Sequence, residues 1–265
     1  MFLEKYLFIM RSSFKDALFY RSKLISSVVL WVFRVGVLFS LYAYAYRYTG
    51  KNVGGISFQV AIWSMAAYFV MNALTARRVY RDISDDVRLG VIETRINKPY
   101  NYLLFRTVMR FGAGLPDFLC ALVVAIPLLL VFAGSPRFDF SFSWLAQFVL
   151  LGIGGILLTY ELFSLVGLSA MWLTEADPVF WIVDKSILIL GGSFVPVALF
   201  PHFVQLISEY TPFGATVFVA RAFNPDFSEK WVELVVIQVV WLVVMTCVTS
   251  AVYQKASRKL SVNGG

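Results

Sequence analysis

Long apolar stretches constrain the fold of this chain more than any other feature. A helix needs roughly 20 apolar residues to cross the ~30 Å hydrocarbon core of a membrane, and a helix satisfies its backbone hydrogen bonds internally there. With 265 residues, the chain has room for six such helices joined by short loops. We therefore predict an all-α polytopic membrane protein in which residues 1–265 form a single transmembrane domain. Its six transmembrane helices are expected at about 24–46, 57–76, 111–133, 144–173, 182–200 and 231–253.

The composition excludes several other classes of protein. Hydrophobic residues make up 59% of the chain and charged residues 15%, which is unlike an ordinary soluble domain. The net charge is +7, and the basic residues that carry it lie beside apolar segments and not in a basic, aromatic binding motif. We therefore expect no nucleic-acid partner. Cys120 and Cys247 stand in apolar stretches without a Cys-x-x-Cys spacing, and His202 is the single histidine. Neither a disulfide framework nor a metal site is predicted, because both need suitably spaced ligands.

The first 22 residues are predicted to form an amphipathic helix that lies at the membrane interface. Apolar residues recur along one side with helical spacing, and the charged residues lie off that stripe. A plain extension of the first transmembrane helix is the alternative. The stripe consists of Leu3, Tyr6, Leu7, Met10, Phe14, Ala17 and Leu18.

A strongly charged run at 77–110 separates the second apolar stretch from the third. Basic residues gather in the cytoplasmic loops of membrane proteins. The topology that places this run inside puts about three basic residues inside for each one outside, so we expect both termini in the cytoplasm. The basic residues of the run are Arg77, Arg78, Arg81, Arg88, Arg95, Lys98, Arg106 and Arg110.

Two short helices are expected within this run. Ser84 is predicted to cap the first, with Asp85 and Asp86 in its first turn, because carboxylates favour the positive end of a helix. Gly90 stands where that helix would end. A second helical piece at 91–97 then leads into Pro99.

The segment from Asp86 to Pro99 reads DVRxGxIExxIxKP, after two apolar stretches and before four. In this pattern and position the chain resembles the membrane subunits of type-2 ABC exporters, and Leu173-Thr174-Glu175 after the fourth stretch is similar to that family too. The resemblance implies that 77–110 is a cytoplasmic coupling loop, whose helix docks on a separate ATPase subunit. The alternative is a solvated basic loop. Contact with the ATPase subunit is expected for Asp82, Asp85, Asp86, Arg88, Gly90, Glu93 and Arg95.

The resemblance implies a permease subunit of a bacterial ABC exporter in the cytoplasmic membrane. Two copies, or one copy and a paralogous permease, would form the pathway, and separate subunits would bind ATP and Mg²⁺. This chain is expected to hold no cofactor and to be no enzyme: its Gly50-Lys51 has Ala45 where a phosphate-binding loop has its first glycine. The substrate implied by analogy is an amphipathic or lipid-like molecule, a drug or a glycan precursor.

Residues 191–225 are predicted to be too interrupted for one transmembrane helix. Proline removes a backbone donor from a helix, and irregular backbone at membrane depth must be enclosed by protein or water. The resembling family has short re-entrant helices at this place, on the outer face between the last two transmembrane helices. The residues expected to interrupt the helix are Gly191, Gly192, Pro196 and Pro201.

Arg34, Glu161 and Asp117 are ionisable residues inside predicted transmembrane helices. Charges at such depth are costly, so each is a candidate for a role in translocation or for a structural ion pair. Arg34 and Glu161 are expected at a similar depth, which predicts that they pair within one subunit or across a dimer. Two other functions stay open: an ion-coupled secondary transporter that uses Glu161 or Asp117, and a non-transporting membrane scaffold. The chain has only one broken segment and lacks the matching repeat that many secondary transporters have.

Overall fold

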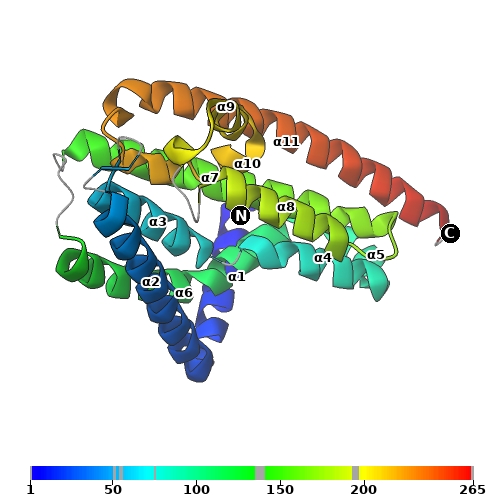
Figure 1. Ribbon diagram of the computed structural model, residues 1–265. Coiled ribbons are helices and arrows are strands. Elements are labelled where there is room, and N and C mark those ends of the chain that lie inside the picture. The colour runs from blue at the N-terminus through cyan, green and yellow to red at the C-terminus, as the bar shows by residue number, and fades with distance from the viewer. Residues whose placement is uncertain are drawn as a thin grey trace.

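Long apolar helices make up most of the structure (Figure 1). The computed structural model describes residues 2–49, 52–53, 56–74, 76–134, 141–192 and 197–263. Within these residues, 5 helical segments are long and apolar enough to cross a membrane. They are built on α2 (Arg21–Thr49), α3 (Phe58–Asn72), α6 (Tyr102–Phe132), α7 (Phe142–Leu168) and α11 (Phe227–Asn263).

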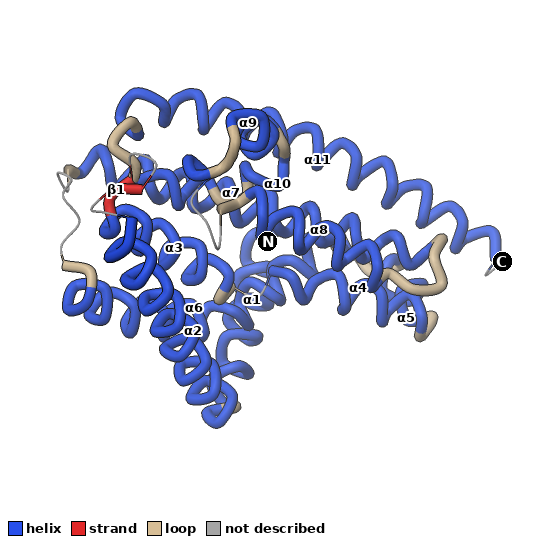
Figure 2. The backbone as a smooth tube through the Cα atoms, viewed as in Figure 1, coloured by secondary structure: helices blue, strands red, loops and turns tan. Residues whose placement is uncertain are grey.

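The two ends of the helix bundle differ. At one end, β1 (Asn52–Val53) and β2 (Ile56–Ser57) form a small antiparallel hairpin, which Figure 2 shows in red. At the other end lie α4 (Val79–Arg88), α5 (Val91–Ile96) and the C-terminal part of α11, which contacts α5 (Figure 1). We call these the loop end and the platform end. The C-terminus and the charged run therefore share one end of the bundle, as the predicted topology requires.

The N-terminal segment is a helix of its own and not an extension of the next one. Helix α1 (Phe2–Phe19) ends before α2 begins at Arg21, and the two helices run in different directions (Figure 1). α1 packs against α6, and the backbone N–H of Asn101 donates to the Tyr6 hydroxyl at 3.2 Å. Its other side leaves Phe8 72% exposed, as an interfacial helix would. Its position in the membrane interface stays a prediction.

The expected fifth transmembrane helix at 182–200 is wrong as a continuous helix. Helix α8 (Asp177–Leu190) has 14 residues, which gives a length of ~21 Å and is too short for the hydrocarbon core. It begins at Asp177, five residues before the expected start at 182, because Asp177 and Pro178 supply a favourable first turn. It ends at Gly191, and Gly192 has a φ of 72°. Pro196 lies outside the described residues.

Short helices follow α8 and carry the chain to the loop end. In Figure 1 the chain leaves α7 at the platform end and enters α11 at the loop end, so the segment between them crosses the bundle in pieces. The interruption after Leu190 and at Pro201 therefore agrees with the sequence, whereas the outer location of these helices stays a prediction. The short helices after α8 are η3 (Val197–Leu199), α9 (His202–Tyr210), α10 (Pro212–Ala215) and η4 (Phe218–Phe223). Another short helix, η2 (Ser169–Met171), follows α7.

Glycines in α7 let two elements approach its backbone closely. A Cβ atom on Gly154 would lie 2.2 Å from Gln238 Oε1 of α11, and one on Gly155 would lie 2.3 Å from the Thr216 carbonyl oxygen. The Gln238 side chain is buried and donates to the carbonyls of Leu151, at 3.1 Å, and Ala215, at 2.8 Å. The absence of side chains at Gly154 and Gly155 thus allows this close contact of α7 with its neighbours.

A Gly155→Val substitution is expected to destabilise this contact by about 1–3 kcal/mol, because the added side chain meets backbone that has nowhere to move. The thermal unfolding midpoint of the purified protein measures the effect. Gly36→Val is the matched control, because a Cβ atom on Gly36 meets nothing within 4 Å. Equal midpoints for the two variants would contradict the packing described here.

Candidate functional site

The charged run folds into two short helices joined at Gly90. Helix α4 begins at Val79, five residues before the expected cap, so the prediction for Ser84 is wrong: its side chain is buried in the middle of α4. Arg78 precedes the helix without capping it through its side chain. Val79 and Ile83 are fully buried one turn apart, which explains why the helix starts early. Gly90, at a φ of 67°, ends α4 as expected.

Two carboxylates fasten α4 to the extended first turns of α6. Asp86 is buried and accepts hydrogen bonds from the Tyr102 hydroxyl at 2.6 Å and from Arg106 Nε at 3.0 Å. Arg110 pairs with both carboxylate oxygens of Asp82. The Asp82 and Asp86 carboxylates are engaged with α6, and contact of these two residues with another subunit stays a prediction. α6 begins at Tyr102 and not at 111, and these added turns supply both arginines.

The remaining predicted contact residues form an exposed tip. Asp85, Arg88, Gly90 and Glu93 are exposed, whereas Arg95 is partly buried and lies 3.4 Å from Asp86. Leu89 at the same turn is 75% exposed. We call residues 85, 88–90 and 93 the tip. A large apolar side chain ringed by charges at the end of a rigid helix pair is typical of a docking surface.

Helix α4 also contacts the segment that follows α7. The rings of Tyr80 and Phe180 stack with their centroids 4.0 Å apart, and the Tyr80 hydroxyl donates to Asp177 Oδ1 at 3.4 Å. Arg88 donates to the Thr174 carbonyl oxygen at 3.4 Å. The segment that follows α7 therefore lies beside the charged run, and it includes the first residues of α8.

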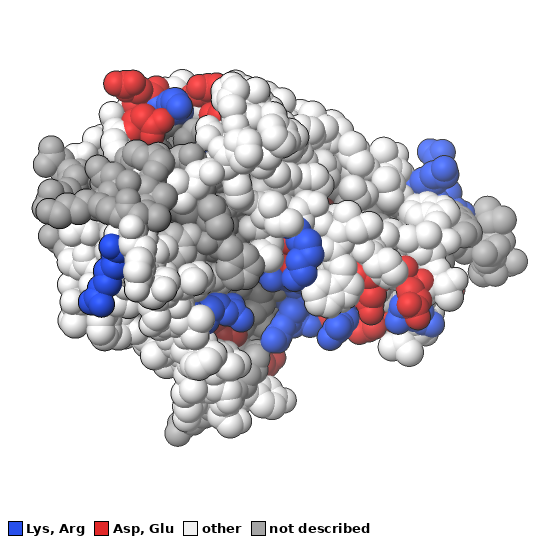
Figure 3. All heavy atoms as spheres, in the orientation of Figure 1, with Lys and Arg blue, Asp and Glu red and all other residues white. Residues whose placement is uncertain are grey.

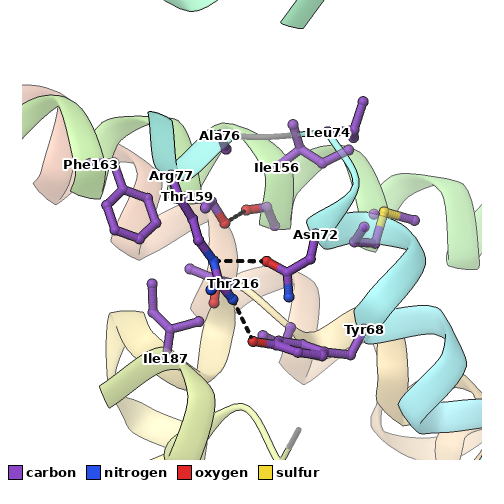
Figure 4. A pocket seen from close by; sticks show the side chains of 14 residues that line it. Tyr68, Asn72, Leu74, Ala76, Arg77, Ile156, Thr159, Phe163, Ile187 and Thr216 are labelled. Carbon is purple, nitrogen blue, oxygen red and sulfur yellow. Dashed lines mark hydrogen bonds between the residues drawn. The ribbon is translucent and has the colours of Figure 1, made fainter. Parts of the chain in front are cut away.

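Arg77, at the start of the charged run, joins three elements, and Figure 4 shows its hydrogen bonds to Asn72 and Tyr68. From η1 (Ala76–Arg78) it donates to Asn72 Oδ1 at 3.1 Å and to the Tyr68 hydroxyl at 2.9 Å, both on α3. Its Nη1 lies 2.9 Å from Oδ1 of Asp184 on α8, whose side chain is 2% exposed. Lys185 Nζ lies 3.2 Å from the other oxygen of that carboxylate. This ion pair between Arg77 and Asp184 thus connects the charged run directly to α8.

This ion pair was missed in the sequence. Asp184 is the third residue of the helix expected at 182–200, and it was not singled out among the ionisable residues of the predicted helices. The signal that could have found it is an acidic residue between Val183 and Ile187, within an apolar helical pattern. A buried carboxylate in such a place requires a cation nearby.

Arg34 and Glu161 do not pair within one chain. The guanidinium of Arg34 lies 5.5 Å from the Phe69 ring centroid on α3. The carboxyl group of Glu161 lies beside the hydroxyl groups of Thr246 and Thr249 on α11. Pairing across two copies stays a prediction. Asp117 lines a cavity of about 250 Å³, together with Arg34 and other residues of α2, α3 and α6.

A second polar cluster holds the short helices near the loop end. Arg221 of η4 lies 3.3 Å from Glu209 of α9 and donates to the Ser208 hydroxyl at 3.3 Å. Burial lowers the pKa of Arg221, and the Glu209 carboxylate partly offsets that shift. The cluster fixes α9 to η4, so this region is an ordered part of the bundle and not a loose loop.

The fold and the site define a multi-pass membrane protein with a charged helix pair at one end of an apolar bundle. A family model described as ABC-2 family transporter protein matches residues 32–264, and the chain belongs to that family. It is thus a membrane-embedded permease of the ABC transporter class, and the resemblance seen in the charged run is confirmed. None of the curated proteins compared with the chain matches it.

Proposed function

We propose that this permease is driven by separate ATP-hydrolysing subunits that dock on the tip at the platform end. The observation that carries the proposal is the contrast within one helix pair: Asp86 is buried against α6, whereas Asp85, one residue earlier, is exposed at the tip. Such a pair transmits a push without bending, because its base is held by ion pairs. The family supports the kind of partner, and binding of ATP and Mg²⁺ belongs to that partner.

The contacts of α4 indicate where a push on the tip would go. Tyr80 presses on Phe180 of α8, and Arg77 holds Asp184 of the same helix. α8 is short and is followed by two glycines, and its far end contacts α9 and α10. Movement of α8 against α3 would open a pathway. Two copies, or one copy and a related permease, would complete the pathway as an exporter in the bacterial cytoplasmic membrane, with both termini inside.

Charge reversal at the tip tests the proposal. The triple variant Asp85→Lys, Arg88→Glu, Glu93→Lys is expected to lose most of the ATPase subunit that copurifies with the wild-type chain, because opposite charges on the docking surface become like charges. The variant should remain folded, since all three residues are exposed.

The matched control reverses the same kinds of charge at the loop end, at Asp226, Glu229 and Lys230, which are also exposed. It should retain the ATPase subunit in full. Undiminished copurification by the tip variant, or equal loss in both variants, would contradict docking at the tip.

A further inference from the structure

A large cavity opens between α2 and the platform end of the bundle. It has a volume of about 620 Å³ and runs along α2, α3, η1 and α8. Figure 3 shows Lys and Arg side chains gathered on this face, between α2 and the platform end. The basic residues in its lining are Arg34, Arg77, Arg78 and Lys185.

The positive charge of this cleft exceeds the negative charge beside it. The carboxylate of Asp184 is shared by Arg77 and Lys185. Within the described part of the chain, neither Arg34 nor Arg78 forms an ion pair, and both side chains are exposed. Asp117, which lines the adjoining cavity, has an interaction of its own. Two cations are thus left facing one cleft, and a cation at membrane depth is stabilised by a partner of opposite charge.

The wall of the cleft on the α2 side is apolar. Phe33 is 71% exposed, Leu30 62% and Val37 50%, and all three line the cavity. The basic residues at 77 and 78 lie at the platform end of α3, whereas this wall continues along the transmembrane helix. A ligand that matches both parts carries a negative charge at one end and hydrocarbon at the other.

We propose that this cleft binds the phosphate headgroup of an anionic membrane lipid, with Arg34 and Arg78 as the ligating groups and the exposed face of α2 against the acyl chains. Guanidinium groups bind phosphate oxygens through paired hydrogen bonds, which suits them to this role. The proposal rests on the proposed function in one respect only, which is that the proposed topology sets the side of the membrane that the cleft faces. Binding itself requires no ATPase subunit and no transport.

The test measures binding of a fluorescent diacyl phosphatidic acid to the purified full chain in neutral detergent micelles. The double variant Arg34→Gln, Arg78→Gln is expected to bind more than tenfold more weakly, since each basic residue near an anionic headgroup contributes about fivefold. The single variants should fall between it and the wild type. Phosphatidylcholine should compete poorly.

The matched control is Arg11→Gln, Arg47→Gln, which removes the same charge from exposed positions outside the cleft. It should bind like the wild type. Equal weakening in both double variants would show attraction by net charge alone and would overturn the site. Glycerol phosphate competing as well as the lipid would overturn the lipid assignment. Absence of binding by the wild-type chain, as when a second copy covers the cleft, would overturn the proposal as well.

Discussion

Asp86→Leu is expected to destabilise the platform end by about 3–5 kcal/mol, because it leaves the buried Arg106 guanidinium without its counter-charge. It also removes the acceptor of the Tyr102 hydroxyl, which is fully buried. The loss appears as a lower thermal unfolding midpoint of the purified protein. Faster proteolysis near α5 should accompany it, since that helix is tied to the bundle partly through Arg95 and Asp86.

Asp85→Leu is the control for this prediction, because its side chain is exposed on the same turn. It should change the midpoint little. The double variant Asp86→Leu, Arg106→Leu should recover part of the loss, since no charge is then stranded. A midpoint for Asp86→Leu equal to that of Asp85→Leu would mean that Asp86 is not part of the base of the platform.

The features that depend only on the length of apolar runs and on backbone geometry could be predicted from the sequence. Five of the expected transmembrane helices are present because an uninterrupted apolar run has one stable form in a bilayer. Gly90 was found because a positive φ favours glycine. The charged run was located for a similar reason, since charge next to apolar helices marks a water-exposed segment.

The length of apolar runs and backbone geometry could not predict whether a given carboxylate in the charged run points into the bundle or toward solvent. Asp85 and Asp86 are neighbours of the same type, and α4 turns one outward and the other inward because Val79 and Ile83 fix which face is buried. The partners of Asp86, Tyr102 and Arg106, lie on α6, which starts nine residues before the predicted position. The fifth transmembrane helix failed for a related reason: an apolar run beyond Leu190 was counted as helix although Gly191 and Gly192 end it.

Arg77→Gln is expected to disconnect α8 from the platform while ATP hydrolysis in the complex continues. The wild-type ion pair joins Arg77 of η1 to the buried Asp184 of α8, so its loss removes the direct ionic link between the two. Spin labels at Ile182 and Val123, both exposed, report the distance between α8 and α6, after Cys120 and Cys247 are replaced by serine. Addition of ATP should shift this distance in the wild-type complex and leave it unchanged in the variant. Arg81→Gln, at an exposed arginine on α4, should respond like the wild type.

A second variant separates transmission from stability. Arg77→Gln leaves the buried Asp184 carboxylate without its guanidinium partner, although Lys185 stays beside it, and should also lower the unfolding midpoint. Arg77→Gln combined with Asp184→Asn removes this buried charge, so the midpoint should recover by about half or more of the loss. The response of α8 to ATP should stay absent in this double variant, because the ionic link is still missing. If the response returned together with stability, the pair would serve only to hold the fold, and the stacked rings of Tyr80 and Phe180 would be left to move α8.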